Sequence, residues 1–160
     1  MKGIPVNAPQ EPEGSSIQRK IREDIASQGW SLIWVFDPDV TVPPFAYTVG
    51  LEWEFGHPEV VVVGLPEAVS EGVLNAVHAE LAEGSRYGDG ETSTEILDGC
   101  AVKFRAIRPD LAAANLVQAE VFNRGSKFEA VQLMWPDKFG NYPDSQGAPA
   151  WLGERQALAP

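Results

Sequence analysis

Apolar side chains recur at helical spacing in three parts of the chain. Isoleucines stand four residues apart over 17–25 with charged residues between them, which predicts an amphipathic helix that ends at Gly29. A stripe of valine and leucine over 69–81 follows Pro66 and predicts a second helix. The alanine-rich stretch over 111–122 predicts a third helix.

Runs of β-branched and aromatic residues between these stretches predict about six strands. The unbroken valine run over 60–63 is typical of a central strand covered on both faces. Asp98-Gly99 lies between two such runs and predicts a two-residue hairpin turn. The expected strands cover residues 30–36, 45–51, 60–65, 94–97, 100–107 and 128–135.

The order of these elements is neither a repeating strand–helix–strand pattern nor all-strand. It predicts an α+β fold with a single mixed or mostly antiparallel sheet of about six strands and about three helices packed on one side of it. A single globular domain is expected over 15–153, with a flexible N-terminal tail over 1–14 and a C-terminal tail over 154–160. The glycine-rich loop over 84–93 is either a lid or, more commonly, a plain connector.

The chain is strongly acidic, with 12 Lys and Arg against 23 Asp and Glu and a formal net charge of −11. Nucleic acid is disfavoured as a partner because its binding depends on cations that neutralise phosphates. The acidic surface either only keeps the protein soluble or binds a basic protein or peptide. Lys103 and Arg105 share one face of a predicted strand, and pairing with carboxylates is the favoured interpretation.

Signals for a metal, a cofactor or a membrane do not occur in the sequence. Cys100 is the only cysteine, so one chain forms no disulfide, and its apolar neighbours favour a buried structural thiol. His57 and His78 lack zinc-binding spacing, and no phosphate-binding glycine motif is present. Neither a secretion signal nor a membrane span is found, so no membrane contact and a cytoplasmic location are expected.

His57 and Glu59 flank Pro58 in the polar turn between two predicted core strands. Residues two apart in an extended segment share a side, so Glu59 could orient His57 as a general base, and this makes the pair the candidate catalytic residues. The alternative is that His57 caps the turn while Glu59 is solvated.

Five other residues are candidates for ligand binding. Tyr47 and Thr48 lie on opposite faces of their strand, so at most one of them faces a given pocket. Gln132 is polar on an otherwise apolar face, and Trp135 and Asp137 mark the end of the last strand, where binding clefts commonly form.

Several blocks of the sequence resemble a bacterial family described only as a domain of unknown function (forty-two sixty-two). The blocks are PPFAYTVGL over 43–51, FGHPE over 55–59, VGLP over 63–66 and QLMWPD over 132–137. The resemblance covers about residues 28 to 153 and implies a small soluble bacterial protein. It transfers no activity and no catalytic residue.

Three functional hypotheses follow. The first is a binding or regulatory module with a polar cleft for a small molecule or a protein. The second is a small hydrolase or peptide-modifying enzyme that uses His57 as general base, with Glu59 or Asp137 to orient it. The third is an immunity or antitoxin-like protein that binds a basic partner through its acidic surface. The cleft of the first hypothesis would be lined by Tyr47, His57, Glu59, Gln132, Trp135 and Asp137.

Overall fold

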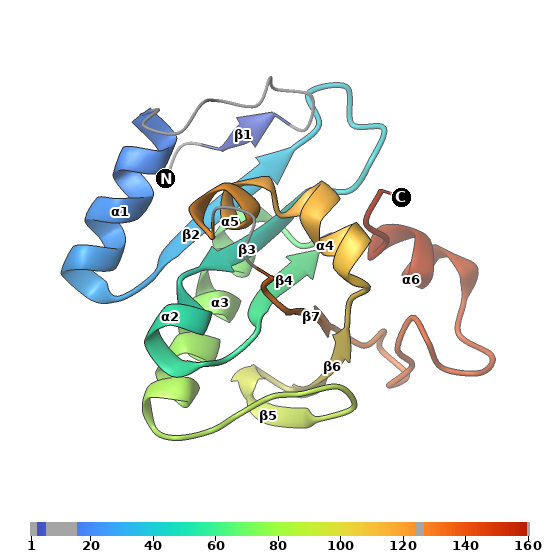
Figure 1. Ribbon diagram of the computed structural model, residues 1–160. Helices are drawn as coiled ribbons and strands as arrows, with labels where there is room; N and C mark the ends of the chain where they lie inside the picture. The colour runs from blue at the N-terminus through green and yellow to red at the C-terminus, as the bar shows by residue number, and fades with distance from the viewer. Residues whose placement is uncertain (1–2, 6–15, 124–126, 160) are drawn as a thin grey trace.

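A seven-stranded sheet forms the centre of the molecule (Figure 1). The computed structural model describes residues 3–5, 16–123 and 127–159. The strands lie in the order β1-β2-β3-β4-β7-β6-β5. They are β1 (Ile4–Pro5), β2 (Ser31–Phe36), β3 (Phe45–Val49), β4 (Glu59–Val63), β5 (Thr92–Leu97), β6 (Cys100–Ala106) and β7 (Ala130–Met134).

The sheet is mixed. β1 runs parallel to β2 and β4 runs parallel to β7, whereas the other neighbours are antiparallel. The α+β class is confirmed, although the described residues form seven strands and six helices rather than about six and about three. The helices are α1 (Ser16–Gln28), α2 (Leu51–Phe55), α3 (Glu67–Ala82), α4 (Pro109–Asn115), α5 (Val117–Phe122) and α6 (Ala150–Arg155).

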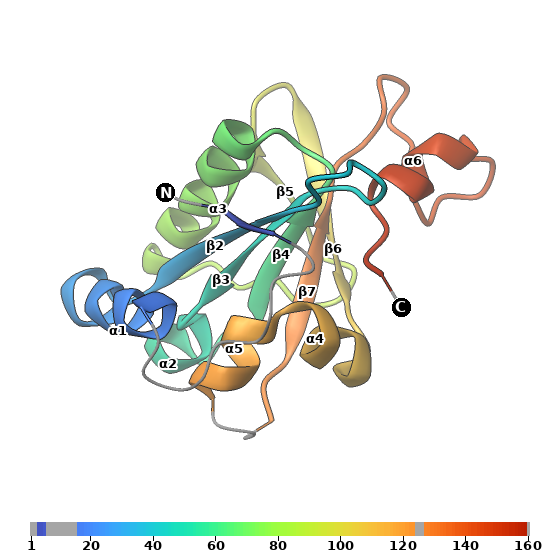
Figure 2. The same cartoon turned by 90° about the horizontal axis from the view of Figure 1, so that it is seen from above.

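Helices cover both faces of the sheet, whereas the sequence predicted them on one side only (Figure 2). α3 packs on one face through side chains such as Leu74, and α1, α4 and α5 pack on the other, where Ile21 is fully buried. The valines at 60–63 alternate between the two cores and are all fully buried, which confirms that β4 is a central strand. Helical periodicity identifies an apolar stripe but not the sheet face that receives it.

Two elements have other bounds than the sequence predicted. In both, the backbone changes direction at a position where the pattern of apolar and polar side chains does not change. The strand expected to reach Leu51 ends at Val49, and Gly50, with a φ of 108°, leads the chain into α2. A non-glycine residue rarely adopts this conformation. The helix expected over 111–122 is divided into α4 and α5 at Leu116, whose ψ of 59° is not helical.

Both ends of the described chain contact the sheet or its loops. Ile4 pairs with Val35, so the region expected as an N-terminal tail contributes a short strand, while residues 6–15 lie outside the described residues. At the other end, α6 continues through position 153, where the domain was expected to end, and Gln156 is only 2% exposed. The segment after β7 therefore packs against the body and helps to form the site described below.

Candidate functional site

His57 is buried in the turn before β4. Its Nδ1 donates to the carbonyl oxygen of Pro58 at 2.6 Å, and its Nε2 accepts the backbone N–H of Tyr87 at 3.0 Å. These partners fix the neutral tautomer, and burial lowers the pKa of His57. Both ring nitrogens are thus occupied by the backbone, and neither is free to act as a general base.

Glu59 is also buried, and its carboxylate holds the start of α2. Oε1 accepts the Thr48 hydroxyl at 2.7 Å and the Leu51 N–H at 3.1 Å, while Oε2 accepts the Gly50 N–H at 2.9 Å. The Thr48 oxygen in turn accepts the N–H of Val60 at 2.9 Å. Burial raises the pKa of Glu59 to about 7, although these hydrogen bonds oppose the rise.

Tyr47 connects β3 to α5 through the core. Its ring is 1% exposed, and its hydroxyl oxygen accepts the backbone N–H of Gln118 at 2.9 Å. Burial raises the pKa of Tyr47 well above its ordinary value. The phenol therefore satisfies a backbone donor at the start of α5 and has no access to solvent.

Gln132 and Trp135 both contact Gln156, a residue that the sequence did not single out. Gln132 donates to the Gln156 carbonyl at 2.6 Å, and the Gln156 side chain exchanges two hydrogen bonds with the backbone of Trp135, at 2.8 and 3.1 Å. The Trp135 indole N–H donates to the Val63 carbonyl at 2.8 Å. This network fixes the chain after α6 against β7.

Asp137 organises the loop that follows β7. Its Oδ1 accepts the backbone N–H groups of Phe139 and Asn141, each at 2.9 Å, and its Oδ2 accepts the Asn141 side chain at 3.1 Å. Burial alone would raise the pKa of Asp137, but these hydrogen bonds together lower it. The carboxylate therefore binds groups of its own loop.

The predicted site residues consequently fall into separate contacts rather than into one cleft. The structure brings Thr48 to Glu59, and it joins Gln132 to Trp135 through Gln156. Each of the other predicted residues serves a different part of the fold. A polar residue at a strand end predicts proximity to solvent, but it does not reveal whether backbone groups already occupy its side chain.

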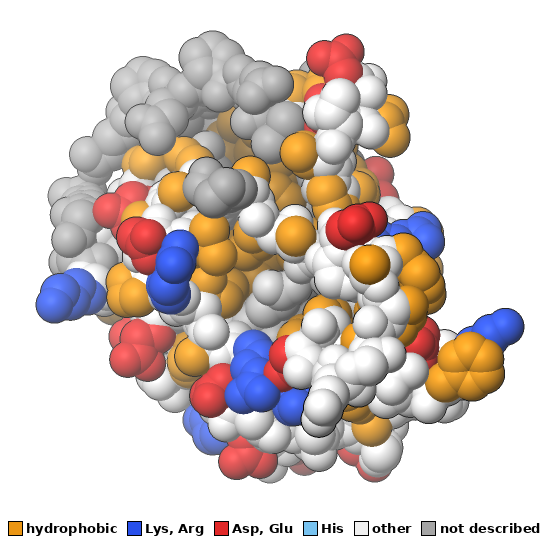
Figure 3. Space-filling view, turned by 90° about the vertical axis from the view of Figure 1, so that its right-hand side faces the viewer, with side chains coloured by type: hydrophobic (Ala, Val, Ile, Leu, Met, Phe, Trp, Pro, Cys, Tyr) orange, Lys and Arg blue, Asp and Glu red, His pale blue; other side chains and the backbone are white. Residues whose placement is uncertain are grey.

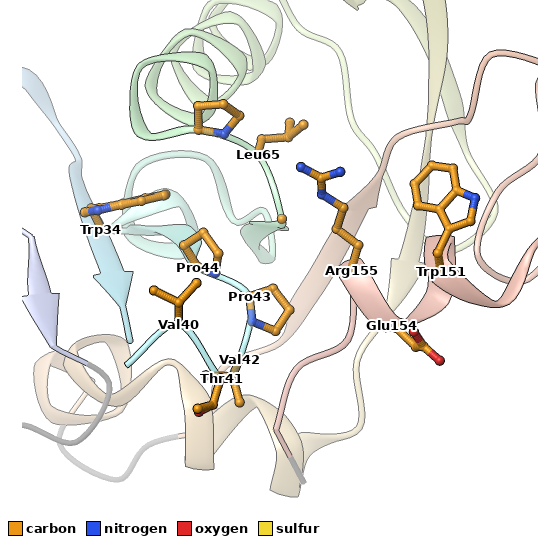
Figure 4. A pocket seen from close by; sticks show the side chains of 12 residues that line it. Trp34, Val40, Thr41, Val42, Pro43, Pro44, Leu65, Trp151, Glu154 and Arg155 are labelled. Carbon is orange, nitrogen blue, oxygen red and sulfur yellow. The ribbon is translucent and has the colours of Figure 1, made fainter. Parts of the chain in front are cut away.

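An open groove lies elsewhere, between the loop 40–44, the turn 64–66 and α6 (Figure 4). We call it the Arg155 groove. Its volume is about 730 Å³, within the range of ligand sites, and Trp34 and Trp151 contribute aromatic surface to its walls. On the face that carries α6, hydrophobic side chains line a hollow (Figure 3).

The loop on one side of the Arg155 groove is held by Asp37. Its carboxylate accepts the backbone N–H groups of Asp39, Thr41 and Val42 and the Thr41 hydroxyl, and these hydrogen bonds lower the pKa of Asp37 to about 2. Val40 lies within this turn with a φ of 55° and is 84% exposed. A β-branched residue in this conformation is rare, and such strain is most often found at functional sites.

The charge in the Arg155 groove comes from α6. The Arg155 guanidinium extends toward Leu65, whereas the Glu154 carboxylate points away from it (Figure 4). Among the described residues, no hydrogen bond or ion pair involves the guanidinium of Arg155. A cation without a partner beside apolar walls suits an anionic group on an apolar ligand.

Other charged and nucleophilic candidates have structural explanations. Lys103 lies 3.5 Å from Asp144, and Arg105 pairs with both Asp144 and Asp89, which confirms the predicted pairing of the basic face. Cys100 is partly exposed rather than buried, because it begins β6 directly after the hairpin turn. In the described part of the chain, no group of three or more His, Cys, Asp or Glu residues could hold a metal ion.

Sequence reasoning missed the residues of the Arg155 groove as a binding site. Val40, Trp151 and Arg155 were not singled out from the sequence as binding residues. A tryptophan outside every predicted strand and helix, two residues after Pro149, was the available signal, because a large aromatic residue there needs either a core or a partner.

Comparison with known proteins identifies a family. A family model described as "Domain of unknown function (DUF4262)" matches residues 24–149, which confirms membership of the family that the sequence resembles. No curated protein and no solved structure matches the chain. Within the described ranges, no helix is both long enough and apolar enough to cross a membrane.

Proposed function

The chain belongs to the family described as "Domain of unknown function (DUF4262)", and from this premise we propose that it is a non-catalytic binding module. Its ligand is an anionic molecule with an apolar body, and it occupies the Arg155 groove. The observation that carries the proposal is the Arg155 guanidinium, which lies without an ionic partner beside apolar walls.

The walls of the Arg155 groove support an apolar ligand body. Pro43, Pro44 and Leu65 offer aliphatic surface, and the indole of Trp151 is 46% exposed. Burial of such surface by a ligand supplies about 25 cal/mol per Å² of apolar area removed from water. Val40 at the rim has a strained backbone conformation, which packing alone does not require and which is most often found at functional sites.

The two alternative functions have weaker support. A hydrolase that uses His57 as general base needs a free ring nitrogen, and both nitrogens bind backbone groups. A basic partner is favoured by the net charge of −11, but only through long-range attraction. The guanidinium in the Arg155 groove offers a specific contact, and it favours an anionic ligand rather than a basic one.

The test uses 8-anilinonaphthalene-1-sulfonate (ANS), a fluorescent dye that combines an aromatic body with one sulfonate. We expect saturable binding to the folded protein, and Arg155→Gln should weaken it about tenfold because a charge-assisted hydrogen bond is lost. Trp151→Ala should weaken it by a similar factor. The matched control is Arg22→Gln, which removes an exposed arginine on α1 and should leave the affinity unchanged.

Circular dichroism of each variant establishes that it is folded before the titration. Equal ANS affinity of the wild type and Arg155→Gln would show that the dye binds elsewhere, and the proposal would then be wrong. A loss of affinity in Arg22→Gln as large as in Arg155→Gln would reduce the effect to net charge and would equally contradict a specific site.

A further inference from the structure

A second depression shares Trp151 with the Arg155 groove. This second groove, which we call the Lys138 groove, has a volume of about 490 Å³ and is lined by the loop after β7 and by Pro149 and Trp151. Trp151 is therefore a wall of both grooves. Its ring centroid lies 6.5 Å from that of the buried Trp135, which supports the shared wall from beneath.

Exposed apolar side chains gather at these two grooves. Five large hydrophobic residues are exposed in the described part of the chain, and three of them line the grooves. These are Val40, Phe139 and Trp151, exposed by 84%, 78% and 46%. Concentration of exposed aromatic and aliphatic surface in one area is characteristic of protein interaction sites.

Like the Arg155 groove, the Lys138 groove contains a cation without an ionic partner in the described part of the chain. Lys138 lies in the second groove with its Nζ 5.1 Å from the ring centroid of Phe139, and among the described residues no carboxylate pairs with it. Asp137 lines the same groove and carries a negative charge, since hydrogen bonds within the loop lower its pKa, but within the described ranges it forms no ion pair with Lys138. One cation without an ionic partner thus stands on each side of the tryptophan.

We propose that the two grooves together bind an extended acidic peptide segment of a partner protein, which crosses Trp151. An acidic side chain contacts Arg155, apolar or proline residues pack on Trp151 and on the loop 40–44, and a second acidic side chain contacts Lys138. This inference rests on the proposed function and names its ligand. A small molecule is usually enclosed on most of its surface, whereas an extended chain suits two open grooves that share one wall.

The test screens a phage library of random twelve-residue peptides on the immobilised full chain. The enriched peptides are then synthesised and titrated by calorimetry. We expect peptides that combine Asp or Glu with aromatic or proline residues, and we expect Arg155→Gln and Lys138→Gln each to weaken binding at least fivefold. Arg22→Gln should bind like the wild type, since it removes a cation outside both grooves.

The outcomes separate this inference from the proposed function. If ANS binds at Arg155 but no peptide is enriched, the binding module stands and the peptide ligand is wrong. If enriched peptides are basic, or bind Lys138→Gln as tightly as the wild type, the two-groove crossing is wrong. If neither ANS nor any peptide depends on Arg155, both proposals are wrong.

Discussion

Glu59 and His57 place ionisable groups in the interior, and both serve backbone donors or acceptors there. Glu59 receives the first N–H groups of α2, which are otherwise without intrahelical partners. His57 ties the turn before β4 to Tyr87, in the loop before β5. Their role is to hold irregular backbone in the core, where an unsatisfied peptide group costs about 1–3 kcal/mol.

The buried carboxyl of Glu59 makes stability depend on pH. Its folded pKa of about 7 exceeds the ordinary 4.5, so the folded state binds more protons between these values. The unfolding free energy contributed by Glu59 is therefore largest at low pH and falls as pH rises from about 4.5 to 7, by as much as about 3 kcal/mol. Glu59→Gln should remove this decrease, as measured by urea unfolding at pH 5 and pH 8.

His57 titrates in the opposite sense, because its lowered pKa makes the folded state lose stability as pH falls below about 6.5. It is present in both proteins, so its contribution cancels when Glu59→Gln is compared with the wild type. Any change in unfolding free energy caused by the amide side chain itself in the Glu59→Gln variant is also independent of pH. An identical pH slope in the two proteins would show that Glu59 is ionised throughout.

The sequence identified individual polar residues but not their partners. His57 and Glu59 were expected in a polar turn between core strands and Gln132 on an otherwise apolar strand face, and each of them forms hydrogen bonds inside the protein. What could not be predicted was the partner of each, because Tyr87 and Gln156 approach from distant parts of the chain. Only the folded arrangement shows that these side chains are already satisfied.

At the scale of elements, α6 and the turn after β4 depend on one glycine. Gly64 has a φ of 88°, and a Cβ at this position would lie 2.2 Å from the backbone oxygen of Arg155. No real Cβ tolerates that distance, so either the turn or α6 must shift. The Arg155 groove exists in its present form because this position has no side chain.

Gly64→Ala should therefore destabilise the protein by roughly 2–4 kcal/mol, from backbone strain and overpacking together. It should also weaken ANS binding, since the shift moves the element that carries Arg155. Urea unfolding and dye titration measure the two effects.

Gly90→Ala provides the matched control for this substitution. Gly90 has a nearly identical φ of 85°, but no atom lies within 4 Å of the added Cβ. Only the backbone cost of about 1 kcal/mol is expected there, with unchanged dye affinity. Equal losses of unfolding free energy in Gly64→Ala and Gly90→Ala would mean that the contact with α6 contributes nothing to the destabilisation.

Long elements were predictable, while short ones were not. α1, α3 and the β5–β6 hairpin follow directly from periodicity and from Asp98-Gly99, because several side chains report each of them. α2 and α6 have five and six residues, too few to establish a helical pattern. Tertiary contacts, such as those of Glu59 with α2, determine them instead.

At the scale of the whole molecule, the net charge of −11 opposes an anionic ligand that Arg155 attracts locally. The opposing field extends about 30 Å at 10 mM salt but only about 8 Å at 150 mM. ANS should therefore bind Arg155→Gln more tightly at the higher salt concentration, because screening removes the repulsion. The ANS affinity of the wild type should change less, since salt also screens the attraction between Arg155 and the sulfonate.

Dye titrations of both proteins at the two salt concentrations measure this difference. A fall in affinity with salt in Arg155→Gln would show that other cations dominate the site. A basic partner would behave differently from ANS, since its attraction to the acidic surface weakens with salt.

The parallel pairing of β4 with β7 has a consequence for synthesis of the protein on the ribosome. β7 fills the position between β4 and β6, but it is made after both of them. While residues 64–129 are translated, which takes roughly 3 to 13 seconds, the valine edge of β4 has no partner on that side. A nascent chain that stops before β7 exposes this edge and is prone to aggregate, so the last strand protects the first half of the protein as much as it completes the sheet.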